Sequence, residues 1–162
     1  MEPIILKIGY AIVLVGTAII RYPYEKKSKS NEIINNKKGA LEANLLRLVV
    51  LGMWIIPLIY FFTDIFSFAD YVLPMPLHIL GFVLIIPTLW LFYSSHKALG
   101  KNWSETLEIR KGHKIIDSGV YKYVRHPMYS AIFLWSIIQA LLLSNYIAGL
   151  TGLLCFGLLY FL

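Results

Sequence analysis

Long apolar runs separated by short polar stretches dominate this sequence. A helix needs about 17–25 mainly apolar residues to cross the hydrocarbon core of a bilayer. Backbone groups in lipid must satisfy their own hydrogen bonds, so these runs predict helices. We therefore predict an all-α, polytopic integral membrane protein, with a single membrane domain over residues 1–162 and five transmembrane helices. The predicted helices cover residues 4–20, 44–62, 76–96, 127–143 and 146–162.

Prolines and one very short connection refine these helices. Because Pro23 disfavours a helical conformation in the residue before it, the first helix is predicted to end before this proline, at residue 20. Pro57 and Pro87 lie inside the second and third predicted helices and predict kinks. The last two apolar runs are separated by Ser144 and Asn145, which predicts a tight antiparallel helical hairpin.

Composition and charge support the membrane interpretation and give it a direction. Hydrophobic residues make up 58% of the chain and charged residues 15%, against about 45–50% apolar residues in soluble domains. The net charge of +6 arises mainly from loops 25–42 and 97–125, whereas loops 63–75 and 144–145 contain no Lys or Arg. Cytoplasmic loops carry an excess of Lys and Arg, so both basic loops are predicted to be cytosolic. Basic residues placed between apolar runs indicate topology and argue against a nucleic-acid partner.

A polar segment leads directly into the fourth predicted helix and carries the candidate chemistry. Pro127 fits the first helical position, with His126 as the cap residue. The exposed N–H groups of Met128 and Tyr129, together with the helix dipole, predict a receptor for a carboxylate. The alternative is that this junction merely starts a helix, with Arg125 as an anchor at the lipid headgroups.

Other polar residues within the apolar runs have simpler interpretations. Gln139 is interpreted as an interhelical hydrogen-bonding residue. His78 and His96 lie near helix ends and are interpreted as interfacial histidines. The single cysteine, Cys155, excludes an internal disulfide, and no residue cluster predicts a metal site.

Gly119, Tyr121 and the run from Arg125 to Tyr129, preceded by His113–Ile116, resemble a known cofactor-binding region. It is that of the isoprenylcysteine carboxyl methyltransferases, particularly the prokaryotic members. The resemblance implies that S-adenosylmethionine is bound by the loop over residues 97–126 and by the start of the next helix. The implied cofactor-binding residues are His113, Lys114, Ile115, Ile116, Tyr121, His126, Pro127, Met128 and Tyr129. Arg125 is a candidate substrate-binding residue.

The resemblance implies O-methylation of the carboxylate of an isoprenylated cysteine, or of a similar lipidic acid. The lipid tail of this substrate would enter between helices, and no catalytic base is assigned because a carboxylate needs none. A prokaryotic protein of this kind would lie in the cell membrane, and a eukaryotic one in the endoplasmic reticulum membrane. Three alternatives remain: a phospholipid N-methyltransferase, a reductase of the sterol type, and a non-enzymatic helical module that binds anionic lipids.

One departure from the family pattern concerns the end of the chain. Family members continue past the last helix into a segment that supplies an arginine for the substrate and a glutamate for the cofactor. This sequence ends at Leu162, inside an apolar run. We therefore expect a chain truncated at its C-terminus, with an incomplete site.

Overall fold

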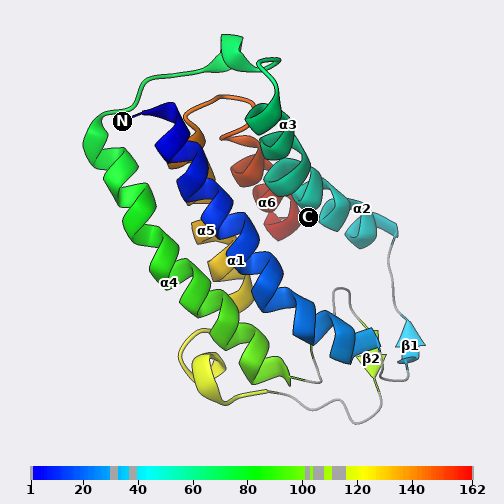
Figure 1. The fold of residues 1–162 in the computed structure, drawn as a ribbon. Helices are drawn as coiled ribbons and strands as arrows, with labels where there is room; N and C mark the ends of the chain where they lie inside the picture. The colour runs from blue at the N-terminus through cyan, green and yellow to red at the C-terminus, as the bar shows by residue number, and fades with distance from the viewer. Residues whose placement is uncertain are drawn as a thin grey trace.

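The chain folds into a bundle of helices (Figure 1). The computed structural model describes residues 2–29, 33–36, 40–100, 103, 108–110 and 116–161. Among them, three helices are long and apolar enough to cross a membrane: 3–27, 43–62 and 75–99. The principal elements are α1 (Pro3–Lys29), β1 (Ile33–Asn36), α2 (Ala40–Val50), the π-helical turn η1 (Leu51–Ile55), α3 (Ile56–Phe62), α4 (Met75–Leu99), β2 (Glu108–Arg110), the 3-10 turn η4 (Gly119–Lys122), α5 (Pro127–Leu143) and α6 (Thr151–Phe161).

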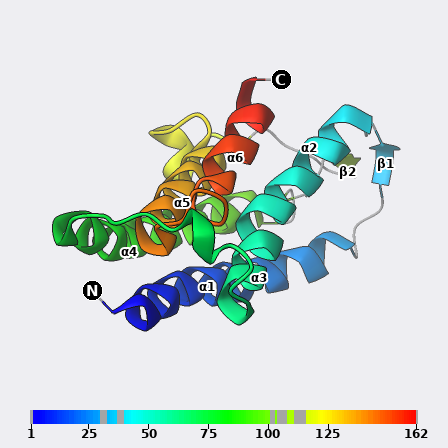
Figure 2. The same ribbon diagram turned by 90° about the horizontal axis from the view of Figure 1, so that it is seen from above.

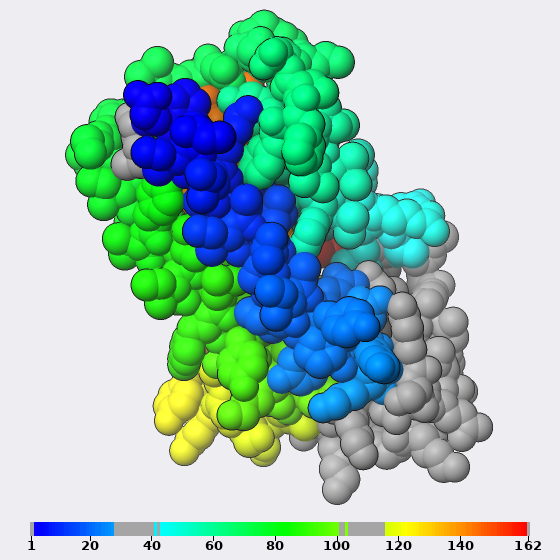
Figure 3. All heavy atoms as spheres, in the orientation of Figure 1, coloured from blue at the N-terminus to red at the C-terminus, as the bar shows by residue number. Residues whose placement is uncertain are grey.

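Two views show how the helices pack. Seen from above, α5 lies beside α4 and α1, whereas α6 lies toward α2 (Figure 2). The space-filling view shows α1 running diagonally across one face, between α4 and the α2–α3 segment (Figure 3). At the contact of α4 with α5, a Cβ atom on Gly81 would lie 2.8 Å from a methyl group of Leu142. The absence of a side chain at Gly81 therefore lets the two helices approach closely.

The first helix is longer than the sequence predicted, because α1 continues through Pro23 to Lys29. A proline inside a helix removes one backbone hydrogen bond and crowds the carbonyl four residues earlier. The carbonyl that Pro23 leaves without a helical donor is that of Ile19, near the end of the apolar run, and the helix continues past it. The prediction that the helix ends at residue 20 was therefore wrong.

The second predicted helix contains a π-helical turn instead of a simple kink. Over Leu51–Ile55 the hydrogen bonding lengthens, and the N–H of Ile56 donates to the carbonyl of Leu51. This shift leaves the carbonyl of Gly52 without its usual helical donor. Pro57 has no N–H, so the carbonyl of Met53 also lacks a donor.

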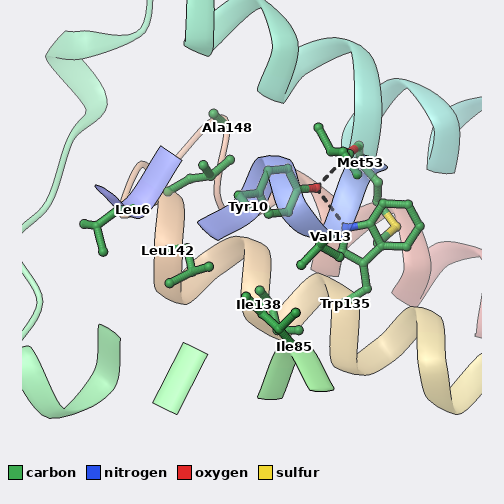
Figure 4. Close-up of a cluster of buried hydrophobic side chains, with 11 residues drawn as sticks. Leu6, Tyr10, Val13, Met53, Ile85, Trp135, Ile138, Leu142 and Ala148 are labelled. Carbon is green, nitrogen blue, oxygen red and sulfur yellow. Dashed lines mark hydrogen bonds between the residues drawn. The ribbon is translucent and has the colours of Figure 1, made fainter. Parts of the chain in front are cut away.

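Side chains from other helices satisfy both freed carbonyls. The hydroxyl of Tyr10 lies 2.8 Å from the Met53 carbonyl oxygen, and Nε2 of Gln139 donates to the Gly52 oxygen at 2.7 Å. Trp135 Nε1 donates in turn to the Tyr10 hydroxyl at 3.1 Å (Figure 4). These bonds confirm that Gln139 forms interhelical hydrogen bonds, and they stabilise the π-helical turn against α1 and α5.

The connections gather in two groups at opposite ends of the bundle. β1 and β2, which belong to the first and third connections, pair as a short antiparallel sheet that the sequence did not predict. At the other end, the second and fourth connections meet, since the N–H of Tyr71 donates to Ser144 O and that of Tyr146 to Ala69 O, both at 2.8 Å. The two basic loops therefore lie on the same side, as the charge pattern predicted.

The last helix begins later than predicted, at Thr151 instead of residue 146. Asn145 accounts for the difference, because its buried Oδ1 accepts hydrogen bonds from the N–H groups of Ile147 and Ala148 at 2.9 and 2.7 Å. Such local side-chain bonds compete with helix formation and favour a turn. The connection between α5 and α6 consequently runs from residue 144 to residue 150.

Candidate functional site

A cavity of about 550 Å³ lies among α1, the α2–η1 segment, the end of α4 and the start of α5. One part of its wall is apolar and comes mainly from α2 and η1: Leu41, Leu45, Leu46, Val49, Val50, Met53 and Trp54. The other part carries polar and aromatic side chains: Arg21, His96, Trp103, Tyr121, His126 and Tyr129. The cavity therefore suits an amphipathic ligand, and its volume lies within the range of about 300–1,000 Å³ usual for small-molecule sites.

The start of α5 forms part of the polar wall. His126 is the N-cap residue and Pro127 occupies the first turn, as predicted. The first N–H groups of a helix have no partner within it, and the helix dipole makes this end receptive to negative charge. Because Met128 and Tyr129 line the cavity, this helix start faces a volume that a ligand can occupy.

Tyr121 lines the cavity from the turn that precedes α5. Gly119 begins this turn with a φ of 62°, a conformation that glycine adopts without strain. Burial raises the pKa of Tyr121 to about 12, so its phenol is uncharged at physiological pH. In that state it offers the cavity an O–H group and an aromatic face.

A group of rings closes the polar wall at the end of α4. Gly100, with a φ of 51°, terminates this helix and redirects the chain toward Trp103. The Trp103 ring stacks on that of His96 with centroids 5.3 Å apart and an interplanar angle of 28°. The Arg21 guanidinium carbon lies 5.4 Å from the centre of the Trp103 ring, and Nε of Arg21 lies 3.6 Å from Oε2 of Glu25.

The structure brings together part of the predicted cofactor site. Tyr121, His126, Met128 and Tyr129 all line the cavity. Two further candidates, Ile116 and Pro127, lie close in the chain but are not part of the cavity wall. Pro127 is buried and Ile116 is half-buried. The candidate substrate residue, Arg125, is exposed and lies outside the cavity wall. The remaining three candidates, His113, Lys114 and Ile115, fall outside the described residues.

Sequence reasoning missed two polar members of the wall. His96 was interpreted as an interfacial histidine, yet only 1% of its surface is exposed, because the aromatic rings of Phe92 and Trp103 cover it. Arg21 follows directly after the first predicted helix and was given no role. A polar residue near the end of an apolar run can be recognised as part of a cavity wall only when the helices packed beside it are known.

His78, which was also interpreted as an interfacial histidine, is buried as well. It is 5% exposed, and its Nδ1 lies 2.9 Å from the carbonyl oxygen of Leu141, which joins α4 to α5. It does not line the cavity. The two histidines of α4 therefore have different surroundings.

Comparison with known proteins gives matches over the part of the chain that contains the site. The family model of the isoprenylcysteine carboxyl methyltransferase (ICMT) family matches residues 77–161, just over half of the chain. A protein-S-isoprenylcysteine O-methyltransferase of Schizosaccharomyces pombe is 40% identical over 40 residues, which are 25% of this chain and 17% of the relative. Protein-S-isoprenylcysteine O-methyltransferase B of Arabidopsis thaliana is 34% identical over 53 residues, 32% of this chain and 27% of the relative.

These matches span well under two thirds of the length of either relative. The family match, in contrast, covers α4, the turn at Tyr121, α5 and α6, and so includes the part of the cavity that carries the predicted motif. On this evidence the chain belongs to the isoprenylcysteine carboxyl methyltransferase family.

Proposed function

We propose that this protein is an integral membrane methyltransferase that O-methylates the carboxylate of an isoprenylated cysteine, or of a similar lipidic acid. The observation that carries the proposal is that one cavity has both an apolar wall from α2 and η1 and a polar wall at the start of α5. A lipid tail fits the first wall, and a polar end group fits the second. The names of the two relatives support the same reaction.

The residues present fit S-adenosylmethionine as the cofactor. The first N–H groups of α5, which have no partner within the helix, suit its methionyl carboxylate. The aromatic faces of Tyr121 and Tyr129 suit a sulfonium cation, which aromatic rings attract. When bound, this cofactor supplies an electrophilic methyl group, which an acceptor carboxylate oxygen takes up to give a methyl ester while the sulfonium becomes a neutral thioether.

The charges in the cavity favour an anionic acceptor over an amine. Among the described residues that line it, Arg21 carries a cationic side chain and none carries a carboxylate. A guanidinium group binds carboxylates well and would repel the ammonium head of a phospholipid. Since a carboxylate is already deprotonated, the protein's part is to orient the acceptor and to exclude water.

We also propose five membrane-embedded helices, with the basic loops and the polar wall on the cytosolic side. The pairing of β1 with β2 supports a common side for both basic loops. α5 has 17 residues and α6 has 11, so at 1.5 Å per residue α6 extends about 16 Å, roughly half the hydrocarbon core. The fifth full span therefore stays a prediction.

Transfer of a radiolabelled methyl group tests the function. The purified protein, reconstituted in lipid, is given labelled S-adenosylmethionine with either N-acetyl-S-farnesylcysteine or phosphatidylethanolamine. We expect base-labile label on the first acceptor, because a methyl ester hydrolyses in base. Base-stable label on phosphatidylethanolamine would instead favour an N-methyltransferase. Label on neither acceptor would leave the non-enzymatic membrane module as the better interpretation.

A further inference from the structure

His96 has an unusual position among the residues of the cavity wall. Its imidazole is 1% exposed and lies against three aromatic rings. The ring centroids of Phe92, Tyr24 and Trp103 lie 4.4, 5.3 and 5.3 Å from that of His96. An imidazole so enclosed keeps one orientation, which is what a hydrogen-bonding group needs in order to select a ligand.

One hydrogen bond fixes the tautomer of this ring. Nδ1 of His96 lies 2.9 Å from the carbonyl oxygen of Phe92, and a carbonyl only accepts, so Nδ1 carries the proton. In the neutral imidazole the other nitrogen, Nε2, is then an acceptor. This nitrogen is buried, and no described residue forms a hydrogen bond with it. A buried polar atom without a partner is rare in native proteins and calls for an explanation.

Two other buried polar residues of α4 do not share both features of His96, an unpartnered polar atom and a place in the cavity wall. Thr88 also has a buried oxygen without a partner, but it lies outside the cavity wall. His78 is buried with its Nδ1 against a carbonyl, and it too lies outside the wall. His96 combines a cavity position with an acceptor that lacks a donor, which points to a ligand that brings the donor.

The neighbours of His96 indicate which ligand this is. Arg21 and His96 contact the same indole, since the Arg21 guanidinium carbon lies 5.4 Å from the Trp103 ring centre and the His96 ring 5.3 Å from it. A cation suits a carboxylate, whereas the free Nε2 suits an N–H group. An N-acylated amino acid offers both, because its amide N–H and its carboxylate are attached to the same carbon atom.

We propose that His96 is a positioning residue that accepts a hydrogen bond from the amide N–H of the methyl acceptor's terminal cysteine. The inference rests on the proposed function and adds a selectivity: an acid with an amide nitrogen is bound better than the same acid without one. The carboxylate that receives the methyl group has no proton, so it is not the partner of Nε2. Amino and hydroxyl groups of the cofactor are the other possible donors, and the experiment separates them.

Ligand binding is measured by the fluorescence of the tryptophans in the cavity wall, which include Trp54, Trp103 and Trp135. The probes are N-acetyl-S-farnesylcysteine, the matching S-farnesyl thioether acid without nitrogen, and S-adenosylhomocysteine. His96→Phe keeps the ring and removes the acceptor, whereas His96→Gln places an amide oxygen near the position of Nε2. His78→Gln and Thr88→Val are matched controls on the same helix.

We expect His96→Phe to raise the Kd of the amide-containing acid about tenfold, the effect of one lost hydrogen bond. The Kd values of the acid without nitrogen and of S-adenosylhomocysteine stay within about twofold of the wild-type values. His96→Gln recovers binding to within about threefold, and both controls bind all three probes like the wild type.

Three results would overturn the inference. Equal weakening of both acids would assign His96 a packing role, and a raised Kd for S-adenosylhomocysteine would assign the donor to the cofactor. Unchanged binding of all probes by His96→Phe would remove any role in recognition. If the wild type binds S-adenosylhomocysteine but neither acid, the proposed acceptor is wrong and this inference fails with it.

Discussion

Replacing Gln139 with methionine should destabilise the protein measurably, because this side chain connects three parts of the bundle. The amide is 0% exposed, and its oxygen lies 2.9 Å from the Tyr10 hydroxyl, whose one proton it shares with the Met53 carbonyl at 2.8 Å. Its nitrogen donates to the carbonyl oxygens of Gly52 and Ala148, both at 2.7 Å. Methionine has a similar length and flexible packing but makes none of these bonds.

The magnitude follows from measured values for hydrogen bonds within membranes. Side-chain hydrogen bonds between membrane helices contribute about 0.6 kcal/mol on average, so the loss of three costs roughly 2 kcal/mol. A destabilisation of 1 kcal/mol lowers the Tm of a chain of this size by about 2–4 °C, which predicts a decrease of about 4–8 °C for Gln139→Met. The Gly52 oxygen keeps a bond from Thr151 Oγ1 at 3.1 Å, which argues for the lower half of that range.

The assay is thermal unfolding of the purified variants in one detergent, followed by circular dichroism at equal protein concentration. Ser136→Ala is the matched control, because Ser136 is also 0% exposed on α5 but, among the described residues, donates within its own helix, to Phe133 O at 2.7 Å. We expect the control to unfold within about 2 °C of the wild type. A Gln139→Met variant that unfolds no earlier than Ser136→Ala would refute the structural role given to the π-helical turn and its partners.

Three further predictions concern packing, protonation and the cofactor. Gly52→Ala should destabilise the protein by about 1–3 kcal/mol, because the added Cβ would lie 2.7 Å from the sulfur of Cys155. Gly157→Ala is the control in the same thermal assay: no atom lies within 4 Å of its added Cβ, so the change should be neutral or stabilising. Burial raises the pKa of Tyr121 to about 12 from 10.0, so its contribution to stability is complete below pH 10 and is lost as the pH rises toward 12. The ultraviolet difference between the wild type and Tyr121→Phe should therefore increase with a midpoint near pH 12, and a midpoint at pH 10 would contradict this burial. Tyr129→Leu should raise the Kd of S-adenosylmethionine about two- to fivefold in calorimetry. The Kd of S-adenosylhomocysteine should change little, because this ligand lacks the sulfonium charge. An equal loss of affinity for both ligands would argue against a cation–π contact.

The start of α5 was predictable from the sequence because a local rule governs it. Proline fixes its own φ and lacks an N–H, so Pro127 determines both the first helical position and the cap at His126. The cofactor candidates next to this junction, including Tyr129, consequently reach the cavity together. Local covalent geometry was enough to place this part of the site.

The start of α6 was not predictable by the same reasoning, because longer-range contacts compete with the apolar pattern. The start of α6 depends on Asn145, whose Nδ2 also donates to Asp70 Oδ1 and to Phe66 O in the neighbouring connection, both at 2.7 Å. Those partners are more than 70 positions away in the chain. A hydropathy pattern contains no information about such pairs.

The roles of Arg21 and His96 were missed for a related physical reason. Each lies on a helix whose own sequence shows only a polar residue near the end of an apolar run. Both contact the ring of Trp103, which the turn at Gly100 brings back against α4. Their function therefore depends on three segments that meet only in the folded chain.

The π-helical turn links the fold to the cavity in a way that a regular helix would not. In lipid, apolar packing supplies little force to hold one helix against another, so polar contacts and close packing determine how the helices associate. The turn and Pro57 free two carbonyls that Tyr10 and Gln139 bind, and Trp135 binds Tyr10 in turn. Because Met53 and Trp135 also line the cavity, the same hydrogen bonds that join the helices fix the shape of the wall proposed to receive the lipid tail.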